Sequence, residues 1–281
     1  MQKRRISEIT VVDALKTSGF APGITAIQCP PAPPQSDASL PLPIDRVDCW
    51  WVSSTAAPAD SEGMLRKILS TSELERAERF RFEDLRASYV GHHAALRLII
   101  ARYLQTSPAA LLFTRETNGR PILASPAGRL HFNLSHSGCM AFIAFSCIAP
   151  LGVDVEEVRE VPDFEEIARN HFAPTEVEGL FRVPDAQKLL AFYVTWTRKE
   201  AFVKALGLGL SFPLDGFSTG RPDRPPSLHL QGTPLITEWT VVDLAPSARY
   251  MASLAIRHPN VPIRCWRAEW SWLLNRVQGP R

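Results

Sequence analysis

The sequence predicts a globular protein of mixed helices and strands, organised as about two domains or one large one. The length of 281 residues allows two units at the usual size of about 150 residues per domain. The composition, 45% hydrophobic and 21% charged, is typical of an ordinary soluble domain. Two long helical patterns alternate with short runs rich in β-branched and aromatic residues, which indicate strands.

The N-terminal part begins with an arm and continues into a strand and two helices. Residues 1–45 carry seven of the 24 prolines, so we predict an extended, proline-rich arm. The run VDCWWV at 47–52 predicts a strand, and Ser72 with Glu75 predicts a capping box that opens a helix. In the next helix, residues at spacings of three or four predict one core-facing stripe: Leu85, Tyr89, His93, Leu96, Ile100 and Tyr103.

Strands dominate the middle of the chain. After a turn at Asn118-Gly119, the segment HFNLSHSGCMAFIAFS (131–146) predicts two strands joined at Ser137-Gly138, and GVDVE (152–156) predicts a third. Asp163 with Glu166 marks a helix start. The elements expected after it are a long helix over 185–206 that ends at Gly207, short strands in SLHLQ, EWTVVDL, RYMASLAI and RCWRAEWSW, and a frayed end at 278–281.

The two halves of the chain share a few similarities. Tyr89-Val90 in the first long helix resembles Tyr193-Val194 in the second, and MAFIA (140–144) resembles MASLA (251–255). The offsets between the paired segments are unequal and the identities are few. The residues alone therefore leave internal duplication open.

Charge and cysteine content exclude several classes of protein. The net charge of +2 gives no global field that would attract nucleic acid or an anionic membrane. The five cysteines are scattered, without a pattern typical of disulfide scaffolds, which favours a reducing, intracellular setting. The longest uncharged apolar stretch, 139–153, is too short to span a bilayer. We expect a cytoplasmic protein with no nucleic-acid or membrane partner.

The strand GVDVE carries two carboxylates on one face. Side chains alternate along a strand, so Asp154 and Glu156 project together while Val153 and Val155 face the other way. A strand with a polar outer face would have the same pattern. The other interpretation is a pair of oxygen ligands for Mg²⁺, which binds through one or two carboxylates together with substrate phosphates.

Glu200 lies within the apolar stripe of the second long helix, four residues after Trp196 and three before Val203. A glutamate at such a position is expected to be buried, where its charge is costly unless it is paired or bound to a metal. Lys204, one turn later, shares its face and offers a local ion pair as the alternative explanation. Such a pair would not by itself explain why a charge interrupts the stripe.

Several basic residues are distributed over the first half of the chain. Each alone is typical of a surface residue or a turn. Together with three acidic ligands, they would suit a polyphosphate substrate, whose charge needs several cationic donors. The residues are Arg76, Arg79, Arg86, Arg120 and His136, the last beside Ser135 and Ser137.

The order and spacing of five motifs resemble those of the surfactin-type 4′-phosphopantetheinyl transferases. The match covers about residues 70–220, and W-x-x-K-E-x-x-x-K downstream of G-x-D-x-E is specific for that superfamily. The motifs are NGRP (118–121), FNLSHSG (132–138), LGVDVE (151–156), FAPTE (172–176) and WTRKEAFVKALGLGL (196–210).

This resemblance implies a Mg²⁺-dependent transfer of the 4′-phosphopantetheine arm of coenzyme A to a serine of an apo acyl or peptidyl carrier protein, which releases adenosine 3′,5′-bisphosphate. Such enzymes serve nonribosomal peptide, polyketide or fatty acid synthesis. By resemblance, Glu200 and Lys204 are the catalytic residues, and Asp154, Glu156 and Glu200 hold the metal. The residues expected to bind coenzyme A are Arg76, Arg86, Ser88, Arg120, Pro121, Ser135, His136, Asp154 and Lys204.

The resemblance also implies an α+β fold of two similar subdomains related by a pseudo-twofold axis, with coenzyme A in the cleft between them. We expect subdomains over 46–150 and 151–270, a tail over 271–281, and a monomer. Arg120 stands where many relatives have lysine, and the arm at 1–45 has no counterpart in the family core. The alternatives are a non-catalytic protein that binds coenzyme A or a carrier, and a Mg²⁺-dependent phosphodiester hydrolase.

Overall fold

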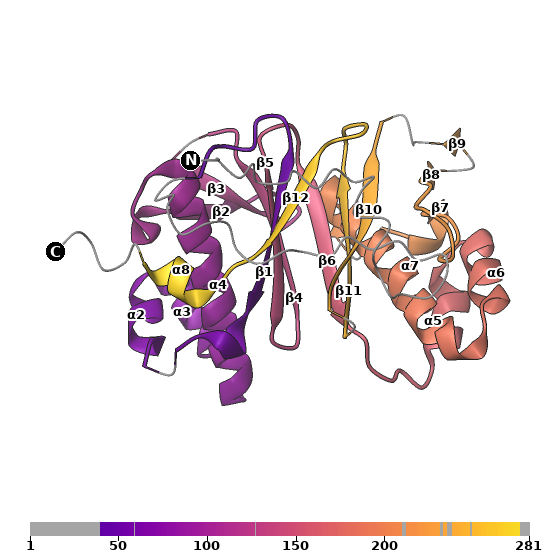
Figure 1. Ribbon diagram of the computed structural model, residues 1–281, viewed down its shortest axis with the longest axis horizontal. Helices are drawn as coiled ribbons and strands as arrows, with labels where there is room; N and C mark the ends of the chain where they lie inside the picture. Colours follow the sequence, from indigo (N-terminus) through magenta and orange to yellow (C-terminus); the bar gives the residue numbers. More distant parts are fainter. Residues whose placement is uncertain are drawn as a thin grey trace, which may run out of the picture.

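The computed structural model describes residues 40–275, except residues 59, 127, 210–211, 231–232, 235–237 and 248. It is a mixed α and β protein whose sheets lie at the centre, with the main helices packed outside them (Figure 1). Most of the predicted arm at 1–45, and the predicted frayed end at 278–281, lie outside the described residues.

The N-terminal half is built on a sheet of four strands in the order β12-β1-β5-β4. Helix α4 packs against one face of this sheet, and α2, α3 and α8 pack around α4 (Figure 1). The elements of this half are β1 (Val47–Ser53), α2 (Glu62–Lys67), α3 (Thr71–Ala77), α4 (Glu83–Leu104), β2 (Leu112–Arg115), β3 (Pro121–Ser125), β4 (His131–Ser137), β5 (Met140–Ser146), β12 (Ile263–Arg267) and α8 (Trp270–Leu274).

The C-terminal half is built on a sheet of three antiparallel strands in the order β10-β11-β6, which α7 covers. Helices α5 and α6 pack beside α7, and the short strands β7, β8 and β9 form a small separate sheet. The elements of this half are β6 (Leu151–Glu157), α5 (Phe164–His171), α6 (Pro174–Arg182), α7 (Asp185–Leu206), β7 (Phe217–Ser218), β8 (His229–Leu230), β9 (Thr233–Pro234), β10 (Thr240–Ser247) and β11 (Tyr250–Ile256).

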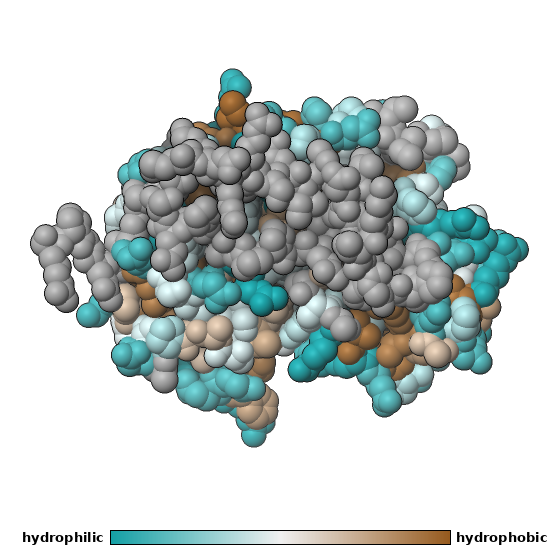
Figure 2. Space-filling view, in the orientation of Figure 1, coloured by the Kyte–Doolittle hydropathy of each residue, from teal (hydrophilic) through white to brown (hydrophobic). Residues whose placement is uncertain are grey.

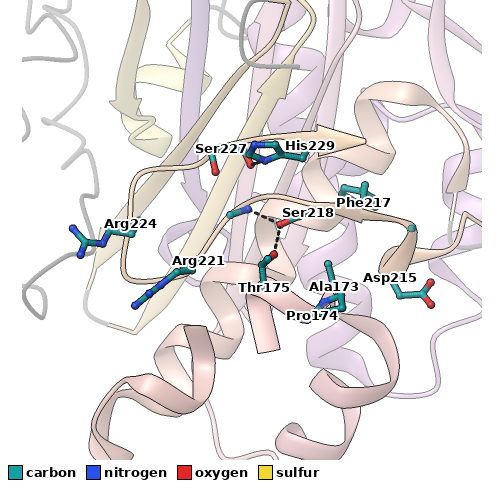
Figure 3. Close-up of a pocket in the computed structure, with 12 residues that line it drawn as sticks. Ala173, Pro174, Thr175, Asp215, Phe217, Ser218, Arg221, Arg224, Ser227 and His229 are labelled. Carbon is teal, nitrogen blue, oxygen red and sulfur yellow. Dashed lines mark hydrogen bonds between the residues drawn. The ribbon is translucent and has the colours of Figure 1, made fainter. Parts of the chain in front are cut away.

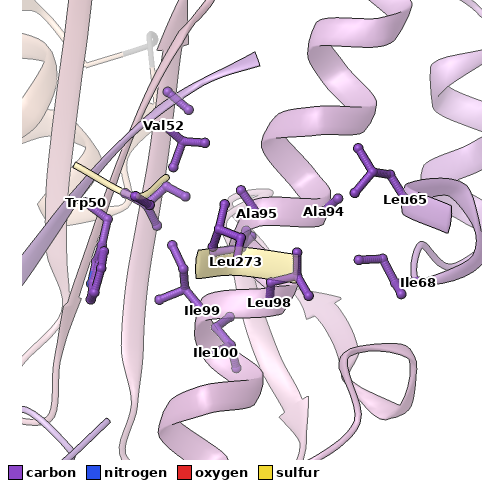
Figure 4. Close-up of a cluster of buried hydrophobic side chains, with 14 of the residues drawn as sticks. Trp50, Val52, Leu65, Ile68, Ala94, Ala95, Leu98, Ile99, Ile100 and Leu273 are labelled. Atoms are coloured by element: carbon purple, nitrogen blue, oxygen red, sulfur yellow. The ribbon is translucent and has the colours of Figure 1, made fainter. Parts of the chain in front are cut away.

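Alternation along the strands builds three layers of core. In β1, Trp50 and Val52 face α4, where they join a cluster with Ile99 and Leu273 (Figure 4). The intervening Trp51 faces the other sheet and packs with Val153 of β6. The order of layers is therefore helix, sheet, sheet, helix.

The last elements of the chain pack against the N-terminal half of the protein. Strand β12 pairs in parallel with β1, and α8 buries Trp272 and Leu273 in the core beneath α4. The sequence RCWRAEWSW predicted one strand, but the structure divides it into β12 and α8. The division into subdomains at 46–150 and 151–270 stays a prediction, as does the pseudo-twofold axis.

The helix predictions are confirmed in position but not in every boundary. The long helix over 185–206 is confirmed, and it ends at Gly207, whose φ of +72° is the left-handed conformation that favours glycine. The capping box at the start of α3 uses Ser70 and Glu73 instead of Ser72 and Glu75. Leu85 was predicted in the core-facing stripe, but it is exposed because α4 has only just begun there.

Part of the surface seen in Figure 2 is polar. Figure 2 shows that the face of the molecule over α6 is mostly hydrophilic, in keeping with the exposed ion pair between Glu178 and Arg182 on that helix. Within the described residues, no helix combines the length and the apolar character needed to cross a membrane.

We expect the close approach of β6 to α7 to be sensitive to a single methyl group. A Cβ atom at Gly152 would lie 2.1 Å from the Ala201 carbonyl oxygen and 2.3 Å from the Ala205 nitrogen, both backbone atoms. Gly152→Ala should therefore lower the free energy of unfolding by about 3 kcal/mol, because helix and strand must separate. Urea unfolding followed by circular dichroism measures the change.

The matched control is Gly63→Ala in α2, where a Cβ would meet no atom within 4 Å. We expect its stability to stay within about 1 kcal/mol of the wild type. Equal losses in the two variants would contradict the tight contact between β6 and α7.

Candidate active site

Several of the predicted site residues, but not all of them, meet at the seam between the two sheets, where β4 lies along β6 and the end of α7 covers β6. Ser135 of β4 donates to Asp154 Oδ1 of β6 at 2.9 Å. The Lys204 ammonium of α7 lies 2.6 Å from the same carboxylate oxygen and 3.1 Å from the Ser135 hydroxyl. Three segments far apart in sequence thus contribute to one polar cluster.

Local structure explains why Asp154 points at α7. The strand places Val153 and Val155 in the core between the sheets, so residues 152, 154 and 156 face the other way. Gly152 lets the backbone of α7 come close to that face. The Asp154 carboxylate then lies within reach of Lys204, and only 3% of Asp154 is exposed.

Glu200 is buried, as its place in the apolar stripe predicted, with 7% of the residue exposed. In the described part of the chain, its Oε1 atom has no hydrogen-bond partner. Burial raises the pKa of Glu200, the charge of Lys204 lowers it, and the charge of Asp154 raises it. The charges of Lys204 and Asp154 therefore both act on Glu200. The ion pair of the Lys204 ammonium, however, is with Asp154 and not with Glu200.

Glu156 lies next to Asp154 on the same face of β6. Its Oε2 atom accepts a hydrogen bond from Ser137 at 2.8 Å. Burial and, secondly, the charge of Asp154 raise the pKa of Glu156. Glu156 and Glu200 therefore both experience the negative charge of Asp154.

The carboxylates have the chemistry of a Mg²⁺ site. Mg²⁺ prefers carboxylate oxygens, and Asp154 Oδ2 and Glu200 Oε1 are buried oxygens that have no hydrogen-bond partner among the residues that the structure describes. Across the described residues, however, no three His, Cys, Asp or Glu side chains are already grouped so that they could hold a metal together. The chemistry of these oxygen atoms therefore fits Mg²⁺. In this structure the positive charge beside Asp154 is that of Lys204.

Arg120 links the NGRP turn to this cluster. Its guanidinium donates to the carbonyl oxygens of Ala205 in α7, at 3.3 Å, and of Leu151 in β6, at 3.0 Å. Burial lowers its pKa. Pro121 follows as the first residue of β3 and is half-buried. The turn therefore lies against the end of α7, near Lys204.

His136 projects from the opposite face of β4, toward α4. Its ring lies 5.3 Å from that of His92. The pKa of His136 is lowered by burial first, and then by the nearby charges of His93, Lys204 and Arg76. Arg76, exposed on α3, is thus close enough to act on His136.

Arg86 and Ser88 are held by other partners in the N-terminal half. Arg86 forms ion pairs with Glu78 at 3.1 Å and with Glu83. The Ser88 hydroxyl lies 3.0 Å from that of Ser54. These contacts do not join either residue to the carboxylates.

The sequence reasoning missed two polar residues of β4. The Asn133 Oδ1 atom accepts a hydrogen bond from the Val153 nitrogen at 2.9 Å, and Ser137 bonds Glu156. The motif FNLSHS could have indicated both residues, because alternation along a strand puts positions 133, 135 and 137 on the same face.

A separate pocket of about 610 Å³ lies beside the start of α6 and β7 (Figure 3). Thr175 and Ser218 face each other there, with their hydroxyls 3.0 Å apart. The residues that line this pocket include none of the predicted site residues. We therefore locate the candidate active site at the polar cluster in the seam and not in this pocket.

Comparison with protein families identifies the family of the chain. A model described as the 4′-phosphopantetheinyl transferase superfamily matches residues 150–255. A second, described as 4′-phosphopantetheinyl transferase, N-terminal, matches residues 57–148. The chain belongs to the 4′-phosphopantetheinyl transferase superfamily, which confirms the resemblance inferred from the motifs.

Curated relatives extend over most of the chain. The 4′-phosphopantetheinyl transferase HetI of Nostoc sp. is 33% identical over 228 residues, which is 80% of this chain and 92% of the relative. The 4′-phosphopantetheinyl transferase Sfp of Bacillus subtilis is 30% identical over 69% of this chain and 85% of its own length. The human L-aminoadipate-semialdehyde dehydrogenase-phosphopantetheinyl transferase is 26% identical over 73% of each chain. The protein is accordingly an enzyme of this transferase type.

Removing the charge of Glu200 should stabilise the fold. Because burial raises the pKa of Glu200, the folded protein holds the proton more tightly than the unfolded chain, and stability is lost as the pH rises through the folded pKa. In metal-free buffer, Glu200→Gln should have a higher urea midpoint than the wild type at pH 8. The difference should shrink toward pH 4.

Glu178→Gln serves as the control, because Glu178 is exposed on α6 and pairs with Arg182. We expect no gain in its urea midpoint at pH 8. A Glu200→Gln variant less stable than the wild type at pH 8 would mean that the Glu200 carboxylate is well satisfied in the fold.

Proposed function

We propose that the enzyme transfers the 4′-phosphopantetheine arm of coenzyme A to a serine of an apo acyl or peptidyl carrier protein, in a Mg²⁺-dependent reaction that releases adenosine 3′,5′-bisphosphate. The observation that carries the proposal is the cluster at the seam in which the part-buried Lys204 lies beside the buried carboxylates of Asp154 and Glu200. Two of their carboxylate oxygens have no hydrogen-bond partner within the described residues. The relatives named as 4′-phosphopantetheinyl transferases support the same reaction.

The reaction exchanges a phosphoanhydride bond of coenzyme A for a phosphoester bond to the carrier. The carrier serine oxygen forms a bond to the phosphorus of the phosphopantetheine, and the bond from that phosphorus to the bridging pyrophosphate oxygen breaks. The serine proton is taken by Glu200, directly or through water, because a buried carboxylate with a raised pKa is suited to accept it. Lys204 steadies the pyrophosphate and the charge that develops on the leaving oxygen.

Asp154, Glu156 and Glu200 would hold the Mg²⁺ ion. The chemistry that Mg²⁺ supplies when bound is neutralisation of the pyrophosphate charge. The protein otherwise contributes positioning and charge stabilisation, and little covalent chemistry.

The basic residues around the seam would bind the remaining phosphate and the adenine region. Arg120 is already fixed between α7 and β6, and Ser135 lies beside Lys204. We assign the same role to His136, to Arg76, whose charge acts on His136, and to Pro121. We also assign coenzyme A binding to Ser88 and to Arg86, which would have to leave its glutamate partners.

We also propose that the two halves are equivalent subdomains related by a pseudo-twofold axis. Each half places a helix of 22 residues, α4 or α7, against a sheet with antiparallel strands. Residues 46–150 would supply the coenzyme A phosphate and adenine contacts, and residues 151–270 the Mg²⁺ ligands and the catalytic helix. A monomeric, cytoplasmic enzyme without a membrane or nucleic-acid partner remains our prediction from the sequence.

The direct test is to incubate the protein with coenzyme A, Mg²⁺ and an apo carrier protein, and to weigh the carrier by mass spectrometry. Transfer adds the mass of one phosphopantetheine to the carrier. A phosphodiester hydrolase would consume coenzyme A and leave the carrier mass unchanged, and a protein that only binds would change neither. Either of the last two results would overturn the proposal.

The acidic residues should be essential for transfer. We expect Glu200→Gln and Asp154→Ala each to lower the rate of carrier modification about 100-fold or more at saturating Mg²⁺, because each removes a charge that the reaction uses. Chelation of the metal with EDTA should abolish the reaction in the wild type. The mass-spectrometric assay measures all three effects.

Glu178→Gln, on the exposed face of α6, should keep the wild-type rate in the same assay. If Glu200→Gln or Asp154→Ala kept near-normal transfer, the roles assigned to them would be wrong.

A further inference from the structure

Three polar side chains of β4 reach across the seam to β6. Strand alternation puts residues 133, 135 and 137 on one face of β4. Asn133 accepts from the Val153 nitrogen, Ser135 donates to the Asp154 carboxylate, and Ser137 donates to the Glu156 carboxylate. Each acidic residue of GVDVE therefore has its own serine opposite.

The hydrogen bonds at Ser137 have a defined direction. The Glu157 nitrogen donates to Ser137 Oγ at 3.1 Å, so the hydroxyl oxygen is already an acceptor. The Ser137 hydroxyl then donates its proton to Glu156 Oε2 at 2.8 Å. A serine held in this way offers the carboxylate a donor of fixed orientation.

The backbone conformation of the turn after Ser137 contributes to the position of this serine. Gly138 has a φ of +54°, in the left-handed region. A Cβ atom at Gly138 would lie 2.6 Å from Glu157 Oε2. Because that atom is the end of a flexible side chain and can move, the requirement for glycine comes from the left-handed backbone of the turn, which sets Ser137 opposite Glu156.

We propose that Ser137 is a positioning residue for Glu156, and that the affinity of the site for a divalent cation depends on it; this inference rests on the proposed function. Glu156 is only part-buried and has one more rotatable bond than Asp154. Ser137 limits the rotation of its carboxylate and leaves Oε1 available for a cation. Groups that orient metal ligands in this way typically change metal affinity by about 10-fold to 100-fold.

The test compares Mn²⁺ binding in serine variants. Mn²⁺ is titrated into the full chain with excess coenzyme A, and the free ion is counted by electron paramagnetic resonance, with coenzyme A alone as the blank. Ser137→Ala should weaken Mn²⁺ binding about 10-fold. Ser137→Thr, which keeps the hydroxyl on a strand-compatible side chain, should stay within about 3-fold of the wild type.

Ser218→Ala is the matched control. Ser218 accepts from a backbone nitrogen and contacts a hydroxyl, as seen in the separate pocket (Figure 3). It should leave Mn²⁺ binding unchanged. Urea midpoints of all the variants monitor folding.

A double-mutant cycle tests whether Ser137 acts through Glu156. If it does, adding Ser137→Ala to Glu156→Gln should cause no further loss of Mn²⁺ affinity. Wild-type Mn²⁺ affinity in Ser137→Ala, or a full additional loss in the double variant, would overturn the inference. Failure of the proposed function would look different, because the wild type would then leave the carrier mass unchanged.

Discussion

The site depends on the contact between β6 and α7 at Gly152. Without a side chain at that position, the backbone of the helix lies directly on the strand. Glu200 and Lys204, one helical turn apart, are thereby brought against Asp154, two residues along the strand. A larger residue would hold the helix away and separate the lysine from the aspartate.

Buried ion pairs then fix how α7 is rotated. Arg198 is fully buried and pairs with Asp243 of β10, while Lys199 is fully buried and pairs with Glu176 of α6. Buried pairs of this kind contribute little net stability, but losing one partner is costly. Since these residues directly precede Glu200, they restrain the direction in which the glutamate points. The motif WTRKEAFVK thus combines anchoring residues with residues of the site.

The sequence was most informative where local spacing decides the structure. Helix α7 was predicted with its bounds because its stripe and Gly207 are local signals, and the burial of Glu200 followed from the same stripe. The partner of Lys204 was not predicted, because Asp154 comes from a strand that only tertiary packing brings near. The helix α8 was missed for the same reason, since Trp270–Leu274 becomes buried against α4 only when the chain returns.

The bridging side chains of β4 have a consequence for how the protein avoids association. Strands β4 and β6 are both end strands of their sheets, and an exposed end strand presents backbone groups that can recruit another chain. Here Asn133 and Ser137 occupy the Val153 and Glu157 nitrogens of β6. The two end strands therefore lie against one another, and side chains of β4 satisfy two backbone nitrogens at the edge of β6. The same polar residues that lie beside the site thereby shield part of the β6 edge from pairing with another strand.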